Sequence, residues 1–175
     1  MARLSEIDTF RTTWEREAEN TIRLLEALPA DQYDFRPDPN GRSIGEMAWH
    51  LSEIDACLSF GVAERRFDLQ DDLPELARPR EIRLLAPGYR RVHELAVARL
   101  RNLKGEELDE PVTFFDGQRL TIREVLWGTM LHHLIHHRGQ LVLLCRMAGG
   151  VPPGIYGPNR EEIDAIRAAM KADKA

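Results

Sequence analysis

Apolar side chains recur at helical spacing along four long stretches of the chain. The first stretch runs from about Ser5 to Leu28, and its apolar positions are Phe10, Trp14, Ala18, Ile22 and Leu25. Residues three or four positions apart share one face of a helix, so this stretch predicts an amphipathic helix. Pro29 ends it, and a loop rich in Pro, Asn and Gly follows through Gly41.

The second helix has a clear start. Ser43 and Glu46 have the spacing of a capping box, in which each side chain bonds the other residue's backbone N–H. The buried stripe that follows consists of Ile44, Met47, Leu51, Ile54 and Leu58. The polar segment from Asp68 to Arg80 predicts a loop.

A third helix is predicted over Ile82–Leu103. Pro87 and Gly88 fall within this span, so we expect the helix to begin after them or to be kinked there. The segment Pro111–Leu120 predicts a small hairpin, because Asp116-Gly117 is a strong tight-turn signal between β-prone residues.

Thr121 and Glu124 repeat the capping-box spacing and open a fourth helix that runs to about Ala148. Gly149-Gly150 ends it, and Asn159 with Glu162 caps a short final helix. The pattern predicts an all-α fold: a four-helix bundle with a short hairpin before the fourth helix and a short C-terminal helix. No repeat or change of composition divides the chain, so residues 1–175 are predicted to form a single domain.

The charge pattern excludes some classes of partner. The 24 basic and 29 acidic residues give a net charge of −5 and are mixed along the chain, so no basic patch for nucleic acid is expected. No apolar run is long enough to span a membrane, and the charged N-terminus does not resemble a signal peptide. Cys57 and Cys145 are too few for a disulfide framework. We therefore expect a cytoplasmic protein.

Histidines are the most informative residues. Of the six, four fall between Leu131 and Arg138. Two pairs have the four-residue spacing that lets imidazoles converge on one ion: His132 with His136, and His133 with His137. Helical phase favours the second pair without deciding the matter, because it continues a row formed by Leu126, Met130, Gln140 and Leu144.

A third ligand would have to come from another helix. His50 lies at the edge of the second helix's apolar stripe and suits this role. His93, beside Arg91 and Glu94, is interpreted as a surface residue. A single interior histidine is more often a hydrogen-bonded core residue than a ligand, so periodicity alone leaves both interpretations open.

The same residues carry a family resemblance. The segment His133–Leu141 resembles the His-xxx-His-Arg-Gly-Gln signature of the DinB/YfiT-like superfamily, and Ser43–Leu51 resembles that family's first-histidine motif. Arg36-Pro37 and Gly41–Ser43 resemble its usual lead-in, and the order and spacing agree along the whole chain.

The resemblance implies a four-helix bundle that holds one divalent metal ion with His50, His133 and His137. His132 and His136 do not match ligand positions and would be packing or interface residues. The resemblance also implies a homodimer. Three imidazoles suit zinc or nickel, and they also accept iron or manganese.

By the same resemblance, the first functional interpretation is a metal-dependent thiol S-transferase. Its partners would be a low-molecular-weight thiol and a small-molecule substrate. The alternatives are a metal-dependent hydrolase and a non-catalytic metal-binding bundle of the stress-response type. Hydrolysis usually needs a general base, but Glu46 is better explained as a cap, and Glu53 and Asp55 are interpreted as surface charges.

No residue is assigned to catalysis at this stage. Arg138 has two interpretations, an anion-binding residue or a structural salt bridge. Gln140 is a candidate partner for a metal-bound imidazole. Gly139 is expected to allow close helix approach, and the cysteines are interpreted as buried apolar side chains. Tyr156, like Trp49 and Trp127, is expected in the core or at a pocket wall.

Overall fold

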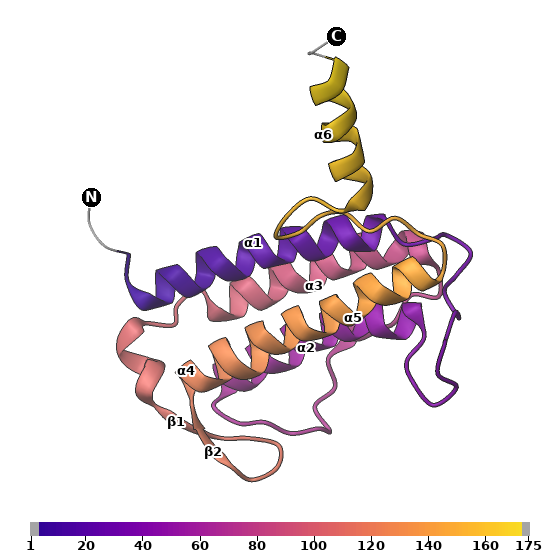
Figure 1. The fold of residues 1–175 in the computed structure, drawn as a ribbon. Helices are drawn as coiled ribbons and strands as arrows, with labels where there is room; N and C mark the ends of the chain where they lie inside the picture. Colours follow the sequence, from indigo (N-terminus) through magenta and orange to yellow (C-terminus); the bar gives the residue numbers. More distant parts are fainter. Residues whose placement is uncertain (1–3, 173–175) are drawn as a thin grey trace.

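Long helices form a bundle in the computed structural model, which describes residues 4–172 (Figure 1). The bundle contains α1 (Glu6–Glu26), α2 (Ile44–Glu64), α3 (Leu85–Leu100) and a last helical stretch that ends in α5 (His133–Met147). Helix α2 contacts both α3 and α5, while α1 packs mainly on α3. The helical bundle predicted from periodicity is confirmed.

Capping side chains set where these helices begin. Ser43 and Glu46 form both bonds of the predicted capping box at α2. Thr121 and Glu124 do the same at the start of the last stretch. At α1, the Ser5 side chain accepts a hydrogen bond from the backbone N–H of Asp8.

The third helix begins earlier than Pro87-Gly88 suggested. A 3₁₀ turn, η2 (Ile82–Leu84), leads into α3 at Leu85. Pro87 lies in the first turn, where backbone N–H groups have no intrahelical acceptor, so its missing N–H costs nothing. A Cβ on Gly88 would lie 2.8 Å from the Trp49 ring, so the glycine permits the close approach of α3 to α2.

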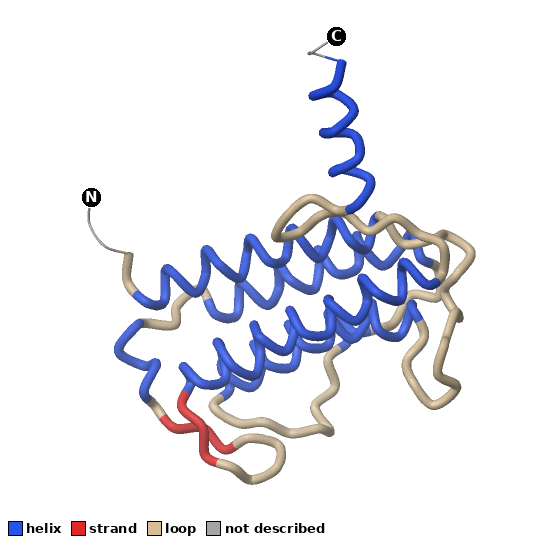
Figure 2. Tube along the Cα trace, in the orientation of Figure 1, coloured by secondary structure: helices blue, strands red, loops and turns tan. Residues whose placement is uncertain are grey.

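The predicted hairpin is present. Strands β1 (Pro111–Thr113) and β2 (Arg119–Thr121) pair antiparallel, as Figure 2 shows in red. Gly117 in the turn has a φ of 83°, which a residue with a side chain rarely adopts. Short 3₁₀ turns, η1 (Pro74–Leu76) and η3 (Gly105–Asp109), interrupt the loops on either side of α3.

The last helical stretch is not uniform. It starts as α4 (Ile122–Glu124), widens into a π-helical segment, η4 (Val125–His132), and continues as α5. The sequence pattern predicts one regular helix over this stretch. π-Helical segments are rare and are often found at functional sites, and this one ends immediately before His133.

The final helix, α6 (Arg160–Ala172), projects from the end of the bundle (Figure 1). Asn159 and Glu162 form the capping bonds that the sequence predicted. None of its described residues is buried, and Ile166 and Met170 are more than half exposed. Within residues 4–172, no helix combines the length and apolar character needed to cross a membrane.

Candidate metal centre

Three histidines predicted from sequence come together between α2 and α5. His50 comes from α2, and His133 and His137 come from one face of α5. One nitrogen of each ring lies within 4.8 Å of the others, and all three side chains are half-buried. His132 and His136 are exposed and lie outside this group. The structure thus favours His133 and His137 over His132 and His136 as candidate metal ligands, as helical phase did.

Each ring is held by a partner outside the group. His50 Nδ1 lies 2.8 Å from Glu53 Oε2, and His137 Nδ1 lies 2.7 Å from Gln140 Oε1. His133 makes a hydrogen bond to the backbone of Thr129. Carboxylate and amide oxygens only accept, so Nδ1 of His50 and of His137 is the donor, and in the neutral form of each ring Nε2 has the free lone pair.

The surroundings favour the neutral form of the two rings on α5. Burial lowers the pKa of His133, and the neighbouring His50 lowers it further. Burial likewise lowers the pKa of His137 to about 4, even though the bond to Gln140 opposes this shift. Only a neutral imidazole has a nitrogen lone pair for a metal. At neutral pH, His133 and His137 are therefore in the form that binds a cation.

The three histidines suit a divalent metal ion, both in their nitrogen donors and in the hydrogen-bond acceptors that hold their rings. Ligands about 2.0–2.1 Å from one zinc ion are separated by about 3–4 Å, so small side-chain rotations would close the group around it. Metal-bound histidines usually donate their other N–H to a carboxylate, carbonyl or similar acceptor. Glu53, Gln140 and the backbone of Thr129 supply that arrangement.

Glu53 has a contact at this site that the sequence pattern did not predict. It was interpreted as a surface charge, but its side chain bonds His50. The signal was available in the sequence, because residue i+3 lies on the same helix face as residue i. Glu46 is a capping residue, as expected, and Gln140 has the supporting position that the sequence suggested.

Two other predictions were wrong: Asp55 and His93 are buried, not surface residues. Asp55 Oδ1 accepts from Trp14 Nε1 at 2.9 Å. Its Oδ2 lies 2.7 Å from His93 Nδ1 and accepts from the Tyr89 hydroxyl at 3.0 Å. The reason is that α2 packs against two helices, so polar residues outside its apolar stripe are also buried. Asp55 faces this polar cluster and is no base for the histidine group.

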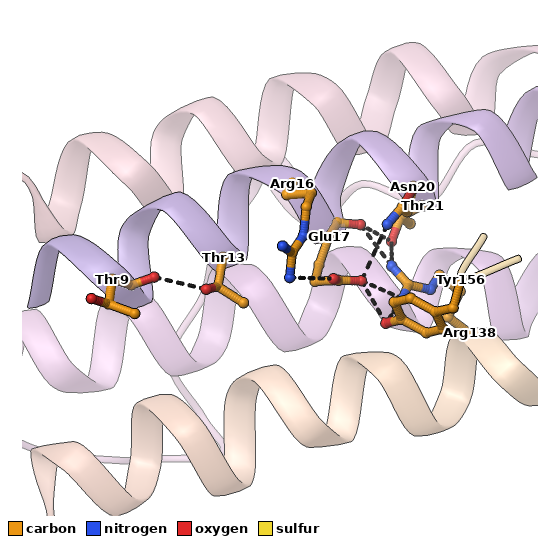
Figure 3. A network of polar contacts seen from close by, with 8 residues as sticks. All are labelled: Thr9, Thr13, Arg16, Glu17, Asn20, Thr21, Arg138 and Tyr156. Carbon is orange, nitrogen blue, oxygen red and sulfur yellow. Dashed lines mark hydrogen bonds and ion pairs between the residues drawn. The ribbon is translucent and has the colours of Figure 1, made fainter. Parts of the chain in front are cut away.

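Arg138 is a structural residue (Figure 3). Its guanidinium donates to the Glu17 carboxylate at 2.5 Å and to the Glu17 backbone oxygen at 2.8 Å. Both side chains are at most 2% exposed. The Tyr156 hydroxyl also bonds Glu17, at 2.7 Å, although Tyr156 as a whole is exposed and not part of the core. This network joins α1, α5 and the segment after α5, and it decides between the two interpretations of Arg138.

Gly139 does not allow close helix approach, because it is exposed and a Cβ there would meet no atom within 4 Å. Cys145 is buried as expected, whereas Cys57 is half-buried. Burial raises the pKa of the Cys57 thiol to about 11, so it stays protonated at neutral pH.

Comparisons with known proteins agree with this architecture. Uncharacterized protein YrdA of Bacillus subtilis (strain 168) is 30% identical over 162 residues, which cover 89% of this chain and 91% of that protein. A DinB-like protein from Bacillus cereus ATCC 10987 has a similar crystal structure, with a TM-score of 0.70 and 28% identity, covering 86% of this chain and 97% of that one.

A second crystal structure, of the DinB-like protein YjoA from Bacillus subtilis, gives a TM-score of 0.68 at 23% identity. It covers 86% of this chain and 99% of that one, and at this identity it supports the fold alone. The sequence profile of the DinB superfamily matches residues 13–141, which include all three grouped histidines. The chain belongs to the DinB superfamily.

Proposed function

We propose that His50, His133 and His137 bind one divalent metal ion and that the protein is a metal-dependent thiol S-transferase. The observation that carries the proposal is the convergence of three supported, half-buried imidazoles from two helices. Zinc and nickel suit the nitrogen donors best. A divalent ion in this site supplies a Lewis acid that lowers the pKa of a thiol or a water molecule.

The residues of the chain have definable parts in such a reaction. Glu53 and Gln140 hold His50 and His137 in the orientation that leaves Nε2 available. In the transfer itself, the thiol sulfur forms a bond to the electrophilic carbon of the substrate. The bond from that carbon to its leaving group breaks with its electron pair, and the thiol proton is lost to solvent.

Hydrolysis is the second candidate because a carboxylate lies beside the histidines. Glu53 is 41% exposed and could accept a proton from water. Its bond to His50, however, already accounts for its position. Among the described residues, the group of potential metal-binding side chains contains the three histidines and no Asp or Glu. The thiol reaction needs no further base, and we therefore place it first.

Titration of cobalt-loaded protein with small thiols separates these functions. The transferase predicts a sulfur-to-cobalt charge-transfer band that saturates with thiol, followed by thiol-dependent consumption of an added electrophile. Metal binding with ester or amide hydrolysis and no thiol band would favour the hydrolase. Metal binding with neither response would indicate a non-catalytic protein. The His132→Ala variant is the matched control and should behave like the unmodified protein.

A further inference from the structure

A cavity of about 480 Å³ lies against the histidine group. His50, His133 and Glu53 form one part of its wall. Most of the remaining wall is apolar and consists of Ile54, Leu58, Leu69, Leu76, Phe114 and Phe115. Pockets that bind small organic molecules commonly have volumes of about 300–1,000 Å³ and mainly apolar walls. This cavity therefore has the size and lining of a small-molecule site.

The aromatic side of the cavity is fixed by packing outside it. Phe67 packs on Phe114 and Phe115, with ring centroids 5.0 and 5.2 Å apart, and these two rings are 4.8 Å from each other. A backbone bridge between Arg66 and Thr113 ties the loop after α2 to β1. The wall is thus formed before a ligand arrives, which reduces the entropy lost on binding.

Leu69 marks the rim of the cavity. It contributes to the wall, yet 82% of its surface is exposed. A large apolar side chain in this position favours a ligand that covers it, since burying its surface releases water. Because Leu69 contributes little to the core, it can be replaced without removing a buried contact.

The charges around the cavity restrict what it can bind. Among its described wall residues there is no Lys or Arg, and Glu53 is the one carboxylate. Cys57, also in the wall, is a protonated thiol at neutral pH. In the metal-free protein, an anionic ligand would lose its water here without gaining a cationic side chain as a partner, and it would face Glu53. The wall therefore favours uncharged ligands.

We propose that this cavity binds the electrophilic substrate and that the substrate is an uncharged, largely apolar molecule carrying an aromatic ring or alkyl chain. The claim that the bound molecule is the electrophile rests on the proposed function. The claim that the cavity binds an uncharged molecule depends on its wall and not on the metal, so each claim can fail without the other.

A matched pair of probes tests the inference: 2-naphthalenemethanol, which is uncharged, and 2-naphthoate, which carries a carboxylate. Their affinities are measured by calorimetry on the protein as purified and after chelation of metal. The chelated protein should bind the uncharged probe about tenfold more tightly than the carboxylate. Equal affinities, or no binding of the uncharged probe, would overturn the proposal.

Three variants locate the binding. Leu69→Glu should weaken binding of the uncharged probe about tenfold, and Leu69→Arg should shift the preference toward the carboxylate. Leu143→Glu is the control, because Leu143 is also exposed but lies outside the cavity wall. Unchanged affinity in Leu69→Glu, or an equal loss in the control, would contradict the assignment. If the probe affinities were as predicted but cobalt-loaded protein gave no thiol charge-transfer band, the transferase proposal would be refuted and the binding proposal would stand.

Discussion

At the residue scale, the histidine group depends on its supporting side chains as well as on its ligands. Both supporting side chains, Glu53 and Gln140, lie three residues after the histidine that they bond. That spacing is a property of a helix, so these pairs could be found from the sequence once the ligand histidines are chosen. Gln140 was predicted as a candidate partner for a metal-bound imidazole without use of this spacing, whereas Glu53 was taken for a surface charge.

Replacing Gln140 with leucine should weaken metal binding by about 10- to 100-fold while leaving the fold intact. The substitution removes the oxygen that holds the His137 ring and replaces it with a group that cannot accept a hydrogen bond. Competition with a chromogenic chelator measures the affinity. Gln118→Leu, in the exposed hairpin turn, serves as the control. Unchanged affinity in Gln140→Leu would show that the bond to His137 has no part in the site.

The buried ion pair makes a different prediction, about stability. Arg138→Met should lower the free energy of unfolding by about 3–5 kcal/mol, because it leaves the Glu17 carboxylate buried without its partner. Urea denaturation measures the loss. The double variant Glu17→Leu/Arg138→Met should recover most of it. A loss no larger than that of Arg146→Met, which breaks a half-buried pair with Glu161, would contradict the structural role of Arg138.

At the element scale, capping residues and glycine turns predicted the ends of helices well, because these signals act through nearby backbone atoms. The capping boxes at Ser43 and Thr121 and the turn at Gly117 are present as predicted. Burial around α2 was predicted less well. It depends on which helices pack on each side, so the apolar stripe alone did not place Asp55 in the interior. The π-helical widening of η4 has no side-chain marker in the sequence.

Thr121 begins the stretch that carries two of the grouped histidines, so its cap affects the site through the helix. Thr121→Ala should lower the free energy of unfolding by about 1 kcal/mol, because the backbone N–H of Glu124 loses its acceptor. Chemical denaturation of the metal-free protein measures this. Thr12→Ala, at an exposed position within α1, should have a smaller effect, and an equal effect would argue against the cap.

At the scale of the whole molecule, the bundle is the frame that brings α2 and α5 together. The order of elements and the positions of the three histidines were predicted from the sequence and the family resemblance. The cavity was not, because its wall combines α2 and the loop after it with the hairpin and the last helical stretch, which are distant from α2 in sequence. The single domain over residues 1–175 and the homodimer stay predictions, and the exposed apolar residues of α6 are a place to look for subunit contacts.

The most direct test of the central claim is the metal content of untagged protein by mass spectrometry, combined with its melting temperature before and after chelation. The account predicts about one divalent ion per chain, lost in His133→Ala and in His137→Ala but retained in His132→Ala. It also predicts a lower melting temperature after chelation, because binding to the folded state alone stabilises it. Failure to bind metal at neutral pH, or retention of metal by His133→Ala together with loss from His132→Ala, would contradict it.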